Sequence, residues 1–280
     1  MAGDAGAIHV FIPDTQVRRP TPEFPCPTDH LGWIGQYICD QFKDRPGVKI
    51  IHIGDHWDMP SLSQYDVGKR AMEGRRYGDD IEAGNTAFDL LNAPLKRLNE
   101  QRRRNKDRQW WPERHFFDGN HENRVVRATE NDPKLYGALS LDDMNVAEHG
   151  WIRHPFLEPA FIDGVGYSHY WYNPMTGNPY SGLLDTKLKT IGHSFSMGHQ
   201  QTLQYGLRYV AGRSQHGLVC GACYLHDETY KGPQGNAYWR GIIVKHQVQQ
   251  GSYDPMFVSL DFLARKYEGV SLEQFLGTHK

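Results

Sequence analysis

Short apolar runs and one amphipathic pattern organise the first part of the chain. Residues 7–13 form an apolar run that ends at Asp14, and residues 48–53 form a second run that leads to Asp55. Between them, apolar residues recur at the spacing of one helix face: Leu31, Ile34, Ile38 and Phe42. We expect a strand, a helix that begins after Thr28, and a second strand. In such a β-α-β unit, the residues that follow the two strands lie at the same edge of the sheet.

Further patterns divide the rest of the chain. An insertion at about residues 59–112 contains helical spacing over residues 79–98, and a third strand is expected at residues 115–117. A mostly helical segment then extends to about residue 149. Beyond it, glycine, aromatic and β-branched residues predict further strands at residues 160–167, 187–191, 217–224 and 237–244. Because no clear linker interrupts the chain, residues 1–280 are predicted to form a single domain that carries this helical, basic insertion.

Composition changes this picture little. Of the 280 residues, 39% are hydrophobic and 23% are charged, as in ordinary soluble proteins. The net charge of -2 argues against a strongly cationic nucleic-acid coat, although a local basic groove stays compatible with it. No run approaches the roughly 18 apolar residues of a membrane span, and the start of the chain lacks a signal-peptide pattern. We therefore expect a cytoplasmic protein without a membrane partner.

Cysteine chemistry is not expected. Cys220 and Cys223 fall within one expected strand, where residues three apart face opposite sides and cannot share a metal. Cys26 and Cys39 show no partner pattern.

Polar motifs at the ends of the apolar runs carry the candidate chemistry. In chain order they are Asp14-Thr15-Gln16, Gly54-Asp55-His56-Trp57-Asp58, Gly119-Asn120-His121-Glu122, Ser168-His169 and Gly198-His199-Gln200-Gln201. Carboxylate, carboxamide and imidazole groups brought to one sheet edge can build a two-metal site. Asp55 is the natural bridge, because its two oxygens can bind two cations. One ligand set would then be Asp55, Asn120, His169 and His199, and the other would be Asp55, Asp14, Gln16 and Gln201.

The same motifs suggest a reaction. Two cations about 3.5–4 Å apart would lower the pKa of a bridging water and neutralise a bound phosphate, and the bridging hydroxide could attack phosphorus in line with the departing oxygen. His121 is placed to protonate the leaving group, and Asp58 could orient its imidazole. Among neighbouring histidines, His169 is preferred to His149 and His154 because it follows an expected strand. His199 is preferred to His193 because a phenylalanine, unable to ligate, stands two residues after His193.

Substrate contacts are less specific in the sequence. Arg124, Arg75 and Arg76 could clamp a phosphate, and residues 102–108 could contact a phosphate backbone or form a solvated helix end. Four aromatic residues could stack on bases or pack in a core: Trp57, Tyr170, Trp171 and Tyr172. A polar cluster at residues 226–228 could reach the cleft, and we assign it no role.

The order of these motifs resembles the calcineurin-like metallophosphoesterases. The resemblance covers roughly residues 8–201, and the block Gly119-Asn120-His121-Glu122 is its most specific part. More narrowly, Pro13-Asp14-Thr15-Gln16 is similar to the opening of phosphoesterases encoded in tailed-phage genomes, which would place the protein in a host cytoplasm. The resemblance implies a four-layer αββα sandwich of two mixed β-sheets flanked by helices, with a dinuclear metal centre at the strand ends.

Two departures from the family pattern refine the expectation. Gln16 and Gln201 stand where the family has histidines. Since amide oxygens are harder ligands than imidazoles, the cation bound by Gln16 and Gln201 is expected to be Mn²⁺ or Mg²⁺ rather than Zn²⁺. The Asn120, His169 and His199 site could take Mn²⁺, Fe, Ni²⁺ or Zn²⁺. Asp58 is followed by methionine and proline, whereas protein phosphatases of this family have arginine and glycine there. This difference argues against a protein phosphatase.

Three functions stay open at this stage. The first is hydrolysis of phosphodiester bonds in nucleic acid or nucleotides, and the second is a phosphomonoesterase acting on nucleotides or small phosphates. The third is a non-catalytic, metal-stabilised binding protein. Retention of His121 and Asp58 argues against the third, since metal binding needs neither residue.

Overall fold

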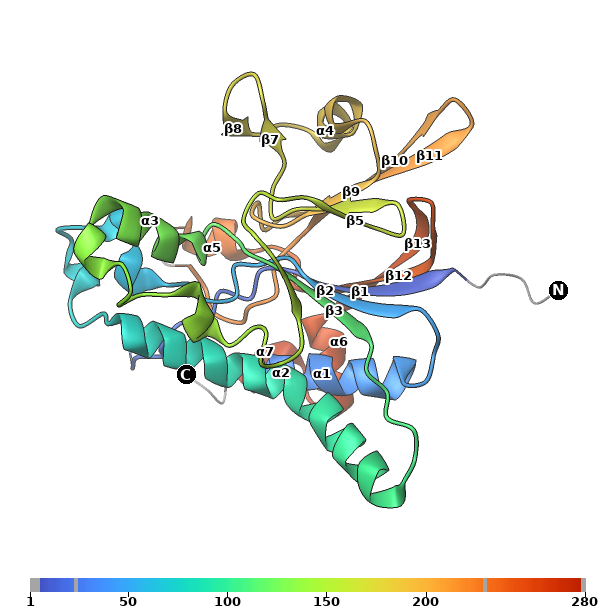
Figure 1. The fold of residues 1–280 in the computed structure, drawn as a ribbon, viewed down its shortest axis with the longest axis horizontal. Coiled ribbons are helices and arrows are strands. Elements are labelled where there is room, and N and C mark those ends of the chain that lie inside the picture. Colours follow the sequence, from blue (N-terminus) through green and yellow to red (C-terminus); the bar gives the residue numbers. More distant parts are fainter. Residues whose placement is uncertain (1–5, 23–24, 229–230, 278–280) are drawn as a thin grey trace.

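The computed structural model describes residues 6–22, 25–228 and 231–277 (Figure 1). Two mixed β-sheets stack face to face, and helices cover their outer faces, so that the described chain forms an α/β sandwich. This confirms the fold class expected from the sequence.

The larger sheet has six strands in the order β13-β12-β1-β2-β3-β4. Their bounds in chain order are β1 Ala7–Ile12, β2 Val48–His52, β3 Glu113–Phe117, β4 Ile152–His154, β12 Gly241–Gln249 and β13 Ser252–Ser259. Strands β1 to β4 run parallel, while β12 and β13 add to the edge of β1 in antiparallel fashion. The expected β-α-β start is therefore correct.

The smaller sheet has five strands in the order β10-β11-β9-β6-β5. Their bounds are β5 Ala160–Ile162, β6 Val165–Tyr167, β9 Phe195–Met197, β10 Leu203–Val210 and β11 Arg213–Cys220. Strands β6, β9 and β11 are parallel neighbours, and β5 and β10 are antiparallel edges. A separate two-stranded ribbon joins β7 (Tyr172–Asn173) and β8 (Asn178–Pro179).

Helices complete the layers. Four of them lie against the outer face of the six-stranded sheet: α1 Asp29–Phe42, α2 Tyr77–Asn105, α6 Leu260–Tyr267 and α7 Leu272–Gly277. On the opposite side, α4 Leu184–Ile191 packs on β10 and β11. Two others, α3 Asn123–Asn131 and α5 Gly232–Asn236, lie beside the loops that follow the strands. Short 3₁₀ turns occur at Pro60–Leu62, Gln64–Asp66, Arg70–Met72, Pro133–Leu135 and Leu141–Met144.

Three apolar cores correspond to the three interfaces between these layers. The largest lies between the helices and the six-stranded sheet and includes Leu31, Phe88 and Phe116. A second fills the space between the sheets with Phe11, Phe117, Tyr167 and other buried side chains. The third lies under α4 and contains Trp171, Leu188 and Phe195. Alternating side chains of β3 thus face different cores, as strand geometry requires.

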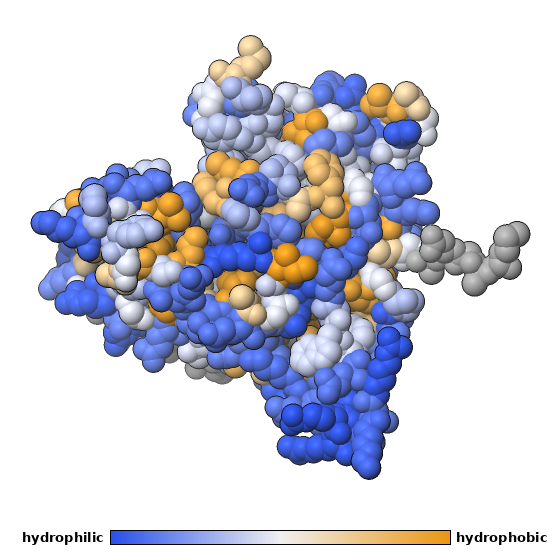
Figure 2. Space-filling model, viewed as in Figure 1, coloured by the Kyte–Doolittle hydropathy of each residue, from blue (hydrophilic) through white to orange (hydrophobic). Residues whose placement is uncertain are grey.

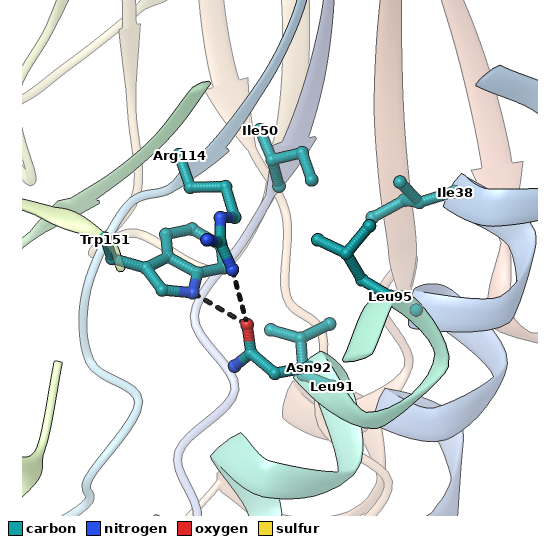
Figure 3. Close-up of a pocket in the computed structure, with 8 residues that line it drawn as sticks. Ile38, Ile50, Leu91, Asn92, Leu95, Arg114 and Trp151 are labelled. Atoms are coloured by element: carbon teal, nitrogen blue, oxygen red, sulfur yellow. Dashed lines mark hydrogen bonds between the residues drawn. The ribbon is translucent and has the colours of Figure 1, made fainter. Parts of the chain in front are cut away.

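Helices α1 and α2 cross closely at Gly35. A Cβ at this position would meet the carbonyl oxygen of Leu91 and would lie 3.0 Å from ring atoms of Pro94, which is inside α2. The insertion is therefore anchored in the helix layer rather than set apart from it. Next to the crossing is a small pocket with largely apolar walls, in which Trp151 Nε1 and Arg114 Nη1 donate hydrogen bonds of 2.8 and 3.4 Å to Asn92 Oδ1 (Figure 3).

Several local expectations were wrong. Residues 187–191 belong to helix α4, because Leu184, Leu188 and Ile191 recur at helical spacing and pack together against the smaller sheet. Residues 160–167 form a hairpin instead of one strand, since Asp163 and Gly164 adopt positive φ values of 48° and 83° and turn the chain. The helical ending of the chain, α6 and α7, was not expected. Thr28 precedes α1 but makes no capping hydrogen bond through its side chain.

None of the described helices is both long enough and apolar enough to cross a membrane. All four cysteines are buried and unbonded to one another.

Candidate metal centre

The polar motifs meet because parallel strands of both sheets end at the same side of the sandwich. Asp14, Asp55 and Asn120 follow β1, β2 and β3 in the larger sheet. His169 and His199 follow β6 and β9 in the smaller sheet. The carbonyl ends of these strands place all five side chains at one edge, as in other open α/β sheets.

One group of four side chains forms a compact donor set. His169 Nε2 lies 3.3 Å from Asp55 Oδ2 and 3.0 Å from Asn120 Oδ1, and His199 Nδ1 lies 2.8 Å from the same Asn120 oxygen. Ligand atoms of Asp55, His169 and His199 all lie within 4.8 Å of one another. A carboxylate, an amide oxygen and two imidazoles that converge in this way fit a divalent cation.

The orientation of His169 is fixed from behind. Its Nδ1 donates a 2.8 Å hydrogen bond to the carbonyl oxygen of Ile53, just after β2, and His169 is almost fully buried. This contact leaves Nε2 as the atom that faces the donor set, which is how proteins commonly orient metal-binding imidazoles.

The residues expected to bind the second cation differ in their hydrogen bonding. Asp14 is fully buried and accepts the backbone N–H of His199 at 3.0 Å. Gln16 Oε1 is buried and has no hydrogen-bond partner among the residues that the structure describes, so a cation would satisfy it. Gln201 Oε1 is instead occupied: Tyr224 donates its hydroxyl at 2.9 Å, and Lys231 Nζ donates as well. Of the two amides expected to bind the second cation, one is therefore open and the other is engaged.

The ionisable side chains of the centre shift one another's pKa values. Burial, with the charge of Asp55 adding to it, raises the pKa of Asp14 to about 7. Burial also acts to raise the pKa of Asp55, but His121 and His169 outweigh it and hold that pKa well below its usual range. Conversely, burial opposes protonation of His169, while Asp55 raises its pKa to about 10. The buried carboxylates thus stabilise positive charge on the neighbouring His169 imidazole, and they would stabilise a cation in the same way.

A proton-transfer pair stands next to the donor set. His121 Nδ1 lies 2.7 Å from Asp58 Oδ1, and its Nε2 lies 3.7 Å from Asp55 Oδ2. Burial would lower the pKa of His121, yet Asp55 and Asp58 raise it above the ordinary value. Arg124 donates to the carbonyl of Asp58 at 2.7 Å and lies 3.2 Å from His121 Nε2. Arg18 completes the surroundings of Asp58 with a 3.8 Å ion pair.

Glu122 was assigned no role from the sequence. Its fully buried carboxylate accepts four backbone N–H groups at 2.7–3.0 Å, those of Asp55, His56, Trp57 and Gly119. Burial, together with the charges of Asp55 and Asp118, raises its pKa to about 7 against the effect of these donors. Glu122 thereby ties the loop after β2 to the loop after β3. The one signal for it in the sequence was its place in the glycine-asparagine-histidine-glutamate block.

Glycine at position 119 is required by the same arrangement. A Cβ there would collide with the carboxylate of Asp55, whose Oδ1 accepts the N–H of His121 at 2.9 Å. The close approach of backbone and carboxylate is possible because Gly119 has no side chain.

Some residues expected at the site are placed elsewhere. Arg75 donates to Asp66 at 2.8 Å and to the carbonyl of Pro60, and exposed Arg76 donates to the carbonyl of Arg75. Neither contacts a residue of the donor set within the described contacts. The competing histidines are also elsewhere, since His154 pairs with His115, His149 lies near Asp89 and His193 packs on Trp171.

The aromatic residues divide between cores and site. Trp57 is fully buried among Phe88 and Phe116, and Trp171 belongs to the core under α4, so neither can stack on a base. Tyr172 lies half-exposed on β7. Tyr170 alone of the four lies beside the centre, with its ring centroid 4.8 Å from that of His199.

The basic stretch after residue 96 lies at the far end of the sandwich. Arg102, near the C-terminus of α2, makes a 2.6 Å ion pair with Asp44, which precedes β2. The centre follows β2 at its other end. Figure 2 shows this end of α2 as a projecting hydrophilic tip.

Comparison with known proteins gave no match, either to a family model or to a curated sequence.

Proposed function

We propose that this chain is a metal-dependent phosphoesterase, similar to the calcineurin-like enzymes, that hydrolyses phosphodiester bonds of nucleic acid or nucleotides. The observation that carries the proposal is the meeting of a buried Asp55, Asn120, His169 and His199 donor set with the His121–Asp58 pair. A site that only bound metal would need the first group and would have no use for the second.

In this proposal, seven residues would hold two cations. Asp55, Asn120, His169 and His199 would hold one, for which Mn²⁺, Fe, Ni²⁺ or Zn²⁺ is suitable. Asp14, Gln16 and Gln201 would share Asp55 to hold the other, with Mn²⁺ or Mg²⁺ favoured. Cations at these positions would supply an acidified water molecule and would neutralise the charge of a bound phosphate.

The neighbouring side chains supply proton transfer and positioning. Asp58 accepts from His121 Nδ1, and this leaves Nε2 as the atom that can give a proton to the leaving oxygen. Asp55 and Asp58 raise the pKa of His121, which favours the protonated imidazole that this role requires. Arg124 lies against the same Nε2 and can donate to phosphate oxygens there. The face of Tyr170, beside His199, offers a surface on which a base could stack.

Hydrolysis of bis-p-nitrophenyl phosphate and p-nitrophenyl phosphate tests the proposal in Mg²⁺, Mn²⁺, Ni²⁺ and Zn²⁺. We expect turnover of the diester with Mn²⁺, and faster turnover of the monoester would identify a phosphomonoesterase instead. His121→Ala should lower kcat by about 10²–10⁴-fold while metal content stays unchanged. Bound metal without hydrolysis of either ester in any of the four ions would favour a binding role.

Arg124→Ala provides a second arm of the same experiment. It should raise KM for the diester, because Arg124 lies beside the atom from which the proton is transferred. Exposed Arg76, which contacts only its neighbour's carbonyl in the described structure, is the matched control, and Arg76→Ala should leave KM unchanged.

A further inference from the structure

Lys231 hydrogen-bonds through its Nζ to Gln201, an expected ligand of the second cation. We propose that its ammonium group is a resident cation at this position, so that a second divalent ion binds only by displacing Lys231. The inference rests on the proposed metal-dependent function and concerns how many cations that site binds tightly.

The first observation is the state of Gln201. Its amide oxygen accepts from Lys231 Nζ and from the hydroxyl of Tyr224 at 2.9 Å. A carbonyl oxygen has two lone pairs, and these two donors use both of them. Gln201 therefore cannot ligate a metal until at least one donor has moved away. Gln16 presents the opposite situation, since its buried Oε1 has no hydrogen-bond partner within the described part of the chain.

The second observation is that Lys231 is built into its place. Its Nζ lies 3.4 Å from the hydroxyl of Tyr224 and 4.9 Å from the ring centroid of Tyr238. Its backbone N–H donates to the carbonyl of Glu228 at 3.1 Å, just before α5 begins. Tyr238 in turn donates its hydroxyl to Tyr224, so the aromatic pair that surrounds the ammonium is itself connected.

The third observation is the charge around this ammonium. The ammonium of Lys231 hydrogen-bonds to Gln201, an expected ligand of the second cation. The guanidinium of Arg240 lies 5.0 Å from the ring of Tyr238 on the same aromatic pair. A divalent ion entering here meets positive charge already bonded to an intended ligand, and this repulsion weakens its binding.

The two cation positions therefore differ in affinity. The Asp55, Asn120, His169 and His199 set holds one ion tightly, whereas the adjoining position exchanges between Lys231 and a second ion. A lysine in this role supplies one unit of the positive charge that a second metal would bring to a bound phosphate.

Calorimetric titration of the metal-free full chain with Mn²⁺ tests the inference. Wild-type protein should bind one Mn²⁺ tightly and a second weakly. Lys231→Met should strengthen the second site by about tenfold or more, because it removes the competing charge. Two Mn²⁺ ions that share Asp55 are close enough to couple magnetically, so the variant should lose the isolated-ion electron paramagnetic resonance signal at lower Mn²⁺ concentration.

Two further variants keep the test decisive. Lys231→Gln removes the same charge with a polar side chain and should behave as Lys231→Met does. Lys189→Met is the charge-matched control on exposed α4 and should bind Mn²⁺ as wild type does. Two equally tight sites in wild type, or an unchanged second site in both Lys231 variants, would overturn the resident cation and leave the metal centre standing. Absence of any tight Mn²⁺ site would overturn the proposed function as well.

Discussion

Four residues of the centre have left-handed backbone conformations. Their φ values are 38° for Gln16, 49° for Asp55, 65° for His199 and 57° for Gln201. Such conformations cost a non-glycine residue about 1–3 kcal/mol each, so surrounding contacts must maintain them. For Asp55, the carbonyl oxygen accepts the N–H groups of Thr15 and Gln16 at 3.2 and 2.8 Å. The loops after β1 and β2 therefore hold each other in shape.

Glu122 should contribute more to stability than its surface-like residue type suggests. Glu122→Gln replaces one accepting oxygen by a donor and leaves some of four buried backbone N–H groups unsatisfied. We expect a loss of about 2–4 kcal/mol in the free energy of unfolding, measured by urea denaturation. Mn²⁺ affinity should fall too, because Asp55 loses its support.

Exposed Glu130 on α3 is the matched control for this change. Glu130→Gln should alter the unfolding free energy by no more than about 0.5 kcal/mol. Equal stability of the two variants would mean that the loops do not depend on Glu122.

At the level of single residues, the sequence predicted the candidate metal ligands better than it predicted the side chains around them. Asp55, Asn120 and His169 could be proposed because each follows an apolar run, and the structure places them together. The burial of Trp57 could not be read from its polar neighbours, since a loop residue can face either way. The partner of Gln201, Lys231, lies 30 positions further along and carries no local pattern.

Among the helices, the crossing of α1 and α2 depends on one missing side chain. Gly35→Ala forces a methyl group against the carbonyl of Leu91 and ring atoms of Pro94. Overpacking of this kind should lower the unfolding free energy by about 1–3 kcal/mol. Thermal and urea denaturation measure the change.

The same helix supplies its own control. At Gly32, no atom lies within 4 Å of the place that a Cβ would occupy, so Gly32→Ala meets open space. Because alanine favours helix over glycine, this variant should gain about 0.5–1 kcal/mol. Destabilisation by both variants to the same extent would contradict a specific contact at Gly35.

The basic end of α2 should be dispensable for catalysis. Helix α2 has 29 residues, which corresponds to about 43 Å, and its C-terminal arginines lie at the end remote from the centre. Removing exposed Arg103 and Arg104 by alanine substitution should change kcat/KM for a small phosphodiester by less than about twofold. A larger loss in steady-state assays would show that this end reaches the reaction.

Element boundaries reveal where pattern reasoning works. The strands β1 and β2 and helix α1 were predicted closely, because each has an uninterrupted apolar period. Helix α4 was mistaken for a strand, since its eight residues are too few to separate a period of two from a period of 3.6. The C-terminal helices were missed because the glycine and aromatic composition of the neighbouring residues suggested strands throughout.

For the whole molecule, buried neutral histidines predict sensitivity to acid. Burial lowers the pKa of His30 to about 3, and its Nε2 donates to the carbonyl of Cys223 at 2.8 Å. Between pH 6.5 and 3 the unfolded chain binds a proton at His30 that the folded chain does not. Stability therefore falls as pH decreases, by about 2 kcal/mol from this residue at pH 5.

Urea denaturation at pH 7, 6 and 5 measures this effect. His30→Gln can still donate to Cys223 but does not titrate, so the loss between pH 7 and pH 5 should be about 2 kcal/mol smaller than in wild type. An identical pH dependence in the two proteins would assign the acid sensitivity to other groups.

The overall arrangement was predicted partly from pattern and partly from resemblance. Hydrophobic periods alone indicate the β-α-β start and its common edge. They do not say that β6 and β9 form a separate sheet whose ends meet that edge, because strand pairing depends on contacts far apart in the chain. That expectation came from the family that the order of the polar motifs resembles.

The donors of the centre belong to two different sheets, Asp14 and Asp55 to one and His169 and His199 to the other. They converge only while the sheets are stacked, so a cation that binds them binds the native state and not the unfolded chain. By linkage, each tenfold rise in free metal above its dissociation constant adds about 1.4 kcal/mol to folding. The midpoint temperature of thermal unfolding should therefore depend on the free metal concentration. It should fall when a chelator is added and rise again when Mn²⁺ is restored. A bound cation would thus link the two sheets, and the free metal concentration would set how much it stabilises the fold.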